Sequence, residues 1–155
     1  MKILLTLAVI LVVLVIAFFG RIYWQNAQVP ALGHQAGQFT PLSANPNGVS
    51  TQTDDPSKQV EPWPFKGDEE ETMQSIKAAV RAYGEAEIVR EESDYLRVVF
   101  ITPTMRYRDD AEFYLDSATR QVHFRSASRA GKSDLGLNRQ RHERLTDLYQ
   151  RDLSR

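Results

Sequence analysis

The hydrophobic pattern begins with residues 3–19, an uncharged and almost wholly apolar run at the amino terminus. With the apolar residues after it, the run approaches the roughly 20 residues needed to cross a hydrocarbon core about 30 Å thick. Bulky side chains follow the run, and the small residues of a signal-peptide cleavage site are missing. Tyr23 and Trp24 suit the aromatic belt of a membrane interface. We therefore expect residues 1–24 to form an uncleaved signal anchor, with a cleaved signal peptide as the alternative.

Residues 25–62 are polar and rich in Gln, Asn, Ser, Thr, Pro and Gly. Few apolar side chains are available there to offset the entropy lost on ordering, so we expect a flexible tether. Within it, the extended piece around Val49 to Gln52 is a candidate edge strand of the domain that follows.

Residues 63–155 have the patterns of one small domain. Asp68 suits the N-cap of a helix over residues 69–83, because the glutamates that follow it stabilise the positive end of the helix dipole. An apolar stripe at helical spacing continues to Gly84, a natural stop for the helix.

Strand patterns follow this helix, separated by turn-like residues. They cover residues 87–91, 95–102, 111–116 and 121–126. Alternation sets the register of the last two strands. A turn at residues 117–120 places Phe113 opposite Phe124 on one surface. The same turn places Glu112 opposite Arg125, an opposite-charge pair, on the other surface.

The chain closes with a helix expected over about residues 135–153, with Ser133 or Asp134 as its N-cap. The inner apolar stripe of this helix, extended backwards by helical steps, reaches Arg141 and Asn138. Polar side chains that point toward the sheet need partners if they are buried. We therefore expect a structural polar network formed by Asp109, Asp110, Glu112, Asp134 and Arg141.

Together these elements predict an α+β fold: an N-terminal transmembrane helix, a flexible linker, a helix, a four-stranded antiparallel meander and a C-terminal helix. Both helices of the domain are expected to cover one face of the sheet. The other face is expected to be partly open and to carry Tyr95, Arg97, Tyr114, His123 and Arg125.

The distribution of charged residues predicts how the chain is oriented in the membrane and argues against nucleic acid as a partner. Lys2 and the terminal amine precede the apolar run, only Arg21 follows it closely, and the next basic residue is Lys58. Because the cytoplasmic side retains basic residues, we expect a single-pass protein of the cytoplasmic membrane with its domain outside, in the periplasm of a Gram-negative cell. The 19 basic and 20 acidic residues do not give the basic surface that nucleic-acid binding needs.

Three carboxylates of the expected network, Asp109, Asp110 and Glu112, are also candidates for catalysis. Acid and base chemistry needs two such groups in unlike environments. Nearby arginines would instead neutralise them within a structural network, which is the interpretation we favour. We therefore assign no catalytic residue.

The loop before the last helix is a candidate anion or partner site. Gly131 and Lys132 superficially resemble a phosphate-binding loop, but the glycine that this motif requires five residues earlier is Ser126. A milder expectation is that backbone amides at the helix start bind an anion together with nearby polar groups. The candidate residues are Arg125, Arg129, Lys132, Ser133 and Asn138.

Metal and cofactor chemistry have no support in the sequence. The chain has no cysteine, so disulfides and thiolate chemistry are excluded. His34, His123 and His142 lack metal-site spacing among themselves or with acidic residues. We expect no metal and no cofactor.

Three motifs carry a resemblance to a known family. They are the stretch from Arg125 to Arg141, the preceding Tyr107-Arg-Asp-Asp-Ala-Glu-Phe113, and the earlier Pro46-Asn-Gly-Val-Ser-Thr-Gln52. With these the chain resembles the domain of unknown function family numbered 1499, found in bacteria and plastids, over about residues 46–150. Gly48 stands where the family usually has cysteine. The resemblance implies membership of a family and no particular activity.

Two classes of function follow from these expectations. The first is a membrane-tethered binding or assembly module on the outer face of the cytoplasmic membrane, whose partner is another envelope protein or an anionic ligand. The second is an enzyme or small-anion-binding protein that acts on an envelope component through the Asp/Glu and Arg cluster. A pocket enclosing Asp110, Arg129 and Arg141 would favour the second class, and a filled core there would favour the first.

Overall fold

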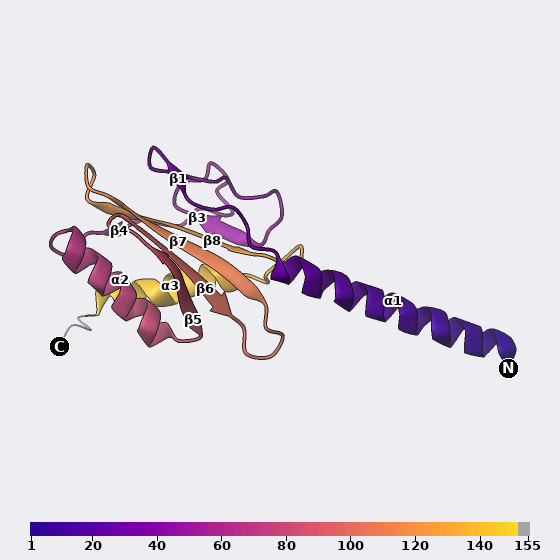
Figure 1. Cartoon of the computed structure of the whole chain (residues 1–155). Coiled ribbons are helices and arrows are strands. Elements are labelled where there is room, and N and C mark those ends of the chain that lie inside the picture. Colours follow the sequence, from indigo (N-terminus) through magenta and orange to yellow (C-terminus); the bar gives the residue numbers. More distant parts are fainter. Residues whose placement is uncertain (152–155) are drawn as a thin grey trace.

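A long helix projects from an α+β domain in the computed structural model, which describes residues 1–151 (Figure 1). This helix, α1 (Lys2–Ala27), has 26 residues and a length of about 39 Å. Within the described residues it is the one helix whose length and apolar composition suffice to cross a membrane. The side chains of its first twenty residues are all exposed, whereas its last turns lie beside the domain.

The domain is built on a six-stranded antiparallel sheet with the order β3-β8-β7-β6-β5, and β4 pairs with β8 beside β3. The expected meander is present as β5 to β8, but two short strands from the preceding segment enlarge it. A separate hairpin, β1 and β2, is not hydrogen-bonded to this sheet as a strand. The strands are β1 (His34–Gln35), β2 (Gln38–Phe39), β3 (Gly48–Ser50), β4 (Trp63–Pro64), β5 (Ala86–Glu91), β6 (Tyr95–Ile101), β7 (Arg108–Asp116) and β8 (Gln121–Ser128).

The register of β7 and β8 follows the alternation of their side chains. Phe113 lies opposite Phe124, and Glu112 lies opposite Arg125, as the sequence predicts. β7 begins three residues earlier than expected, at Arg108, because its first residues pair with the ends of both neighbouring strands. This extension brings Asp109 and Asp110 into the sheet.

Helix α2 (Glu69–Tyr83) matches its sequence signals. Asp68 is the N-cap, and its side chain accepts a hydrogen bond from the backbone amide of Glu71 while the Glu71 side chain accepts one from the Asp68 amide. This reciprocal capping satisfies amides that the first helical turn leaves unpaired. Gly84, with φ of 84°, ends the helix.

Helix α3 (Leu137–Gln150) begins two residues later than the sequence predicts. Leu135 and Gly136 both have positive φ, so the backbone cannot continue as a helix through them. Asp134 nevertheless binds the helix start, accepting hydrogen bonds from the amides of Gly136 and Asn138. Leu153, expected on the inner stripe, lies outside the described residues.

Both domain helices cover one face of the sheet, as expected (Figure 1). Their apolar side chains, such as Ile76 and Leu145, pack with Phe113 and Phe124 in the core. Trp63 of β4 closes this core, and its indole N–H donates a hydrogen bond to Thr146 at 2.8 Å.

The segment expected to be a flexible tether, residues 25–62, differs from that expectation in the structure. The stretch has few apolar residues, but three of them, Phe39, Val49 and Val60, are buried. Hydrogen bonds replace the missing apolar contacts: Gln52 accepts from the amide of Phe39 and donates to the carbonyl of Gly37. Residues 34–40 thus lie against the sheet face opposite the helices, whereas residues 57–61 contact α3. The candidate edge strand is β3.

Candidate functional site

Strand alternation divides the polar residues of the sheet between its two faces. Asp109 follows the parity of Phe113, which faces the helices, whereas Asp110 and Glu112 face the other way. The carboxylates treated above as one network therefore belong to two clusters. We call them the helix-face cluster and the open-face cluster.

The helix-face cluster is centred on Arg141 of α3. Its Nη2 donates to Asp109 Oδ2 at 2.6 Å, and its Nη1 donates to Asn138 Oδ1 at 2.6 Å. The guanidinium also lies over the ring of Phe100, 4.7 Å from its centroid. Arg141 is 2% exposed and Asp109 is 1% exposed. This low exposure places the pair in the closed core, where the Arg141 Nε has no hydrogen-bond partner among residues 1–151.

Asn138 connects this cluster to three other segments. Its amide group donates to Asp134, to the hydroxyl of Ser128 and to the carbonyl of Asn47. Its carbonyl accepts from Ser126 at 2.5 Å. An asparagine with these contacts holds the start of α3 against the sheet, and its side chain is fully buried.

The open-face cluster begins with Asp110, which two arginines bind. Arg97 donates to Asp110 Oδ1 from both Nε and Nη2, at 3.0 and 2.7 Å. Arg129 donates from Nε to Oδ2 at 2.6 Å and from Nη2 to Oδ1 at 3.0 Å. Asp110 is 1% exposed. Arg129, expected in a free loop, is instead largely buried and ion-paired.

Glu112 is the second carboxylate of the open-face cluster. Arg125 donates to Glu112 Oε2 at 3.0 Å, and the Tyr95 hydroxyl donates to Glu112 Oε1 at 2.7 Å. Burial raises the pKa of Glu112, against the opposing effects of Tyr95 and Arg125. Burial, and then the hydrogen bond to Glu112, raise the pKa of Tyr95. Arg125 also donates to the carbonyl of Thr40, which ties the segment before β3 to this face.

The open-face cluster has more guanidinium groups than carboxylates. Arg97, Arg125 and Arg129 share Asp110 and Glu112, so ionised pairs leave one positive charge in excess. Burying a charge that has no counter-charge is energetically unfavourable, and the approach of an opposite charge offsets this cost. This excess is the electrostatic feature that would attract an anion.

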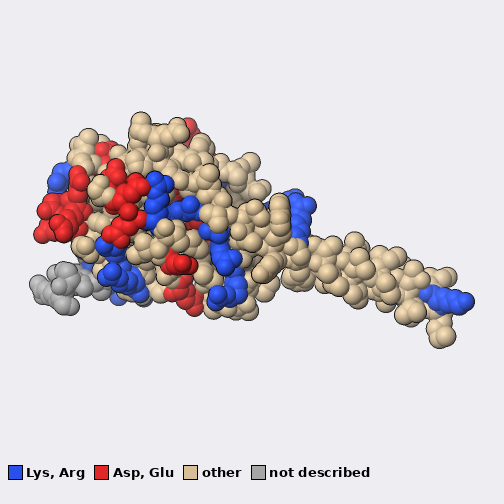
Figure 2. Space-filling view, in the orientation of Figure 1, with Lys and Arg blue, Asp and Glu red and all other residues tan. Residues whose placement is uncertain are grey.

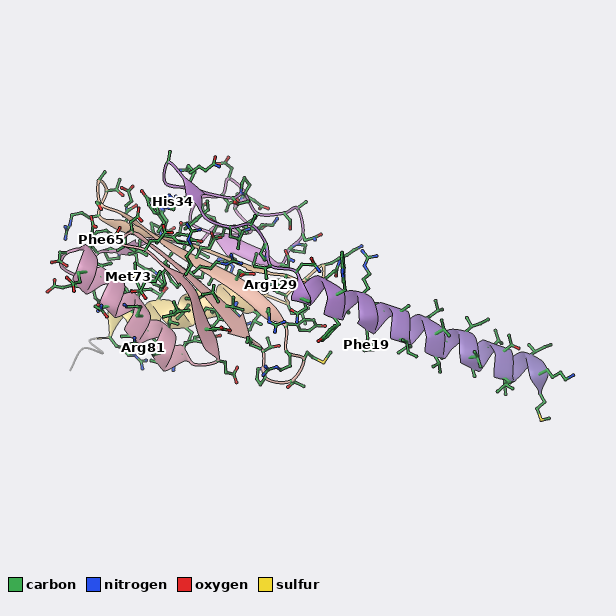
Figure 3. All side chains as sticks on the ribbon, viewed as in Figure 1. Phe19, His34, Phe65, Met73, Arg81 and Arg129 are labelled. Atoms are coloured by element: carbon green, nitrogen blue, oxygen red, sulfur yellow. The ribbon has the colours of Figure 1, made fainter. Side chains whose placement is uncertain are left out.

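Two clefts open onto this cluster beside the end of α1. One, of about 350 Å³, is lined by Asp110, Arg125 and Arg129 together with Gln25 and Gln28. The other, of about 690 Å³, is lined by arginines of the sheet and by the last turns of α1. Figure 3 shows Arg129 next to this end of α1.

The structure thus separates the residues that the sequence grouped. Asp110, Arg125 and Arg129 share a cleft, whereas Arg141 lies on the opposite face of the sheet. Lys132 and Ser133 are exposed in the loop before α3 and join neither cluster. The side chain of Asn138 is hydrogen-bonded within the helix-face cluster.

Sequence reasoning missed Arg90, Arg108 and Asn26 as residues of this region. Arg90 and Arg108 line the larger cleft. The Asn26 side chain accepts from the amide of Arg108 at 2.7 Å and donates to the carbonyl of Arg106 at 2.8 Å. The parity of β7 would have placed Arg108 on the open face, whereas Arg90 reaches that face only because β5 has a register shift between Ile88 and Arg90. No local signal links α1 to the turn before β7.

The histidines have separate environments. Within the part of the chain that the structure describes, no group of three or more His, Asp or Glu side chains is placed to hold a metal ion. His142 is packed against Trp63 and Phe124, and burial lowers its pKa to about 4. Burial also lowers the pKa of His123, which lies beside Tyr114 on the open face.

Gly48, the residue that replaces the usual cysteine in the first motif, has a structural reason to be small. A Cβ added there would lie 2.8 Å from the carbonyl oxygen of Ser126 and 2.9 Å from the Cβ of Ala127. The pairing of β3 with β8 therefore leaves no room for a side chain at this position.

Comparison with known proteins identifies a family. No curated protein and no solved structure matches the chain. A family model described as "Protein of unknown function (DUF1499)" matches residues 38–148, which include both polar clusters and most of the sheet. The match begins inside the segment that was expected to be a tether, in agreement with its packing on the sheet. The chain therefore belongs to the DUF1499 family.

Proposed function

We propose that this protein is a membrane-tethered binding module that binds an anionic ligand, or an anionic group of an envelope partner, at its open-face cluster. The single observation that carries the proposal is the excess of buried arginine over carboxylate in a face that opens into two clefts. Arginine is suited to this role because its planar donors match carboxylate and phosphate groups.

The proposed location is the outer face of the cytoplasmic membrane. The length and apolar character of α1 support a membrane anchor, and the basic residues near its ends favour a cytoplasmic amino terminus. Membrane fractionation followed by intact-mass measurement tests the anchor. A mature protein that begins after residue 20 would contradict an uncleaved anchor.

The enzymatic alternative has weaker support. Asp109, Asp110 and Glu112 each have an arginine partner, and a carboxylate held in this way is a poor general base. The raised pKa of Glu112 and its bond to Tyr95 are the features that would favour proton transfer. No unpaired carboxylate stands beside Glu112 within the described open face to act as the second group.

Thermal unfolding of the full chain in a neutral detergent tests anion binding. A ligand that binds only the folded state raises its melting temperature. We expect inorganic phosphate to raise the melting temperature above that measured in chloride at equal ionic strength. Arg108→Gln should reduce this rise, because Arg108 lines the cleft and its guanidinium makes no ion pair within residues 1–151.

Arg81→Gln is the matched control, because Arg81 is exposed in the last turn of α2, on the other side of the sheet. It should leave the phosphate effect unchanged. Equal melting temperatures in phosphate and chloride for the wild-type chain would contradict the proposal.

A further inference from the structure

The larger cleft lies where α1, the proposed membrane anchor, meets the sheet. Tyr23 and Ala27 of α1 form one wall, and Val29 follows them. Strands β5 and β6 supply Val89 and Val99 on the opposite side. The cleft therefore has an apolar wall that continues from the surface of the helix itself.

The geometry of α1 indicates where the cleft lies relative to the membrane. Tyr23 is four residues beyond the apolar run 3–19, which corresponds to about 6 Å along the helix axis. Tyrosine at this position suits the headgroup layer of a bilayer. Asn26 is hydrogen-bonded to the backbone on both sides of Tyr107, so the end of α1 and the sheet are held together. The mouth of the cleft is thus placed at the level of lipid headgroups.

The charge of the cleft complements a phosphate. Arg90, Arg97, Arg108 and Arg129 line it, with Glu87 as the carboxylate among its lining residues. Arg97 and Arg129 already bind Asp110, and Arg90 binds Glu92. Arg108 has no such partner in the described chain and has its donors free for a ligand. Figure 2 shows acidic side chains gathered at the end of the domain far from α1, and basic ones spread across this face of the domain, including the part nearer to α1.

From these observations we infer that the cleft binds the headgroup of an anionic glycerophospholipid, with its phosphate at Arg108 and its glycerol and acyl start against Val29 and Val89. The inference rests on the proposed function and names the ligand class of the same face. A soluble phosphate shares the charge chemistry but not the apolar wall. The two sources of phosphate are therefore distinguishable by experiment.

Lipid retention on the full chain is the direct test. The chain is purified in a neutral detergent, mixed with equal amounts of phosphatidylglycerol and phosphatidylcholine, and examined by native mass spectrometry. We expect one phosphatidylglycerol to remain bound in preference to phosphatidylcholine. Arg108→Gln should weaken this binding about tenfold, since a charge-assisted hydrogen bond is lost. Arg81→Gln should leave it unchanged.

A second variant separates the lipid from a free anion. Val89→Gln removes part of the apolar wall without changing charge, and Val89 is half exposed, so the fold should tolerate the change. It should reduce retention of phosphatidylglycerol and leave stabilisation by soluble glycerol phosphate intact.

The possible failures are distinct. Stabilisation by glycerol phosphate that depends on Arg108, without selective lipid retention, would overturn the lipid inference and leave the proposed function standing. Equal lipid retention by the wild-type and Arg108→Gln chains would show lipid bound around α1 alone and would also overturn it. A chain that responds to neither lipid nor soluble phosphate would contradict both.

Discussion

Asp109 and Asp110 are neighbours in the chain, yet their side chains lie on opposite faces of the sheet. Asp109 binds Arg141 of α3 in the core, 2.6 Å away. Asp110 binds Arg97 and Arg129 on the open face. Because β7 is flanked by β6 and β8, neither carboxylate can reach solvent at a sheet edge. Each therefore depends on the arginines of its own face.

Removal of Arg141 should destabilise the domain. Arg141→Ala leaves Asp109 buried without its charge partner, at a cost of about 3 to 5 kcal/mol in the free energy of unfolding. Urea unfolding of the full chain in detergent measures the change. Arg144→Ala is the control, because Arg144 is exposed on the same helix. An Arg141→Ala domain as stable as the wild type would mean that the pair is not structural and would favour a ligand site there.

Arg129 and Lys132 should differ in their effect on stability, although both precede α3. Arg129→Ala should lower the free energy of unfolding by about 1 to 3 kcal/mol, because a charged hydrogen-bond partner of Asp110 is lost. The loss should be smaller than that for Arg141→Ala, since Arg97 still binds Asp110. Lys132→Ala should have little effect, because Lys132 is exposed. Equal melting temperatures of the two variants would contradict this difference.

The contrast between Arg141 and Arg129 shows what the sequence could predict. The inward position of Arg141 follows from helical periodicity, and its meeting with Asp109 follows from strand parity. Both patterns are local, as are the cap at Asp68 and the pairing of Phe113 with Phe124. The burial of Arg129 is not a local property, because it depends on how the residues after α1 cover the open face.

The packing of residues 25–62 on the domain could not be predicted from the sequence, for a similar reason. Its composition resembles that of a disordered linker, because it contains few apolar residues. What orders it is a set of polar contacts with distant strands. Arg125 binds the carbonyl of Thr40, and the ring of His34 lies 4.3 Å from that of Tyr114, centroid to centroid. A periodicity of apolar residues cannot reveal such contacts.

Residues 34–50 should therefore resist proteolysis in the folded chain. Digestion with a protease of broad specificity should begin at the exposed turn of residues 103–106 rather than in this segment. Phe39→Ala should accelerate cleavage within the segment, because Phe39 is buried against Tyr114. Mass spectrometry of the early fragments locates the cuts. First cleavage between residues 34 and 50 in the wild-type chain would restore the prediction of a flexible tether.

The stability of the domain should fall as the pH drops from about 6.5 to about 4, with His142 as one cause. Burial against Trp63 and Phe124 lowers the pKa of His142 from 6.5 to about 4. Because the unfolded chain binds this proton at a higher pH than the folded one, stability is full above pH 6.5 and decreases toward pH 4. At pH 5 the loss should be on the order of 2 kcal/mol, since each pKa unit corresponds to about 1.4 kcal/mol.

His142→Gln removes this titration and retains a donor for the carbonyl of Glu61, which His142 Nε2 contacts at 3.0 Å. The variant starts from a lower stability at pH 7, because a glutamine fills the space beside Trp63 less well than the imidazole ring. The quantity that tests the prediction is therefore the change in the free energy of unfolding between pH 7 and pH 5, measured by urea unfolding. This change should be smaller in the variant than in the wild-type chain by roughly the His142 contribution. Equal changes in both chains would assign the acid sensitivity to other groups, such as the ion-paired carboxylates of the two clusters.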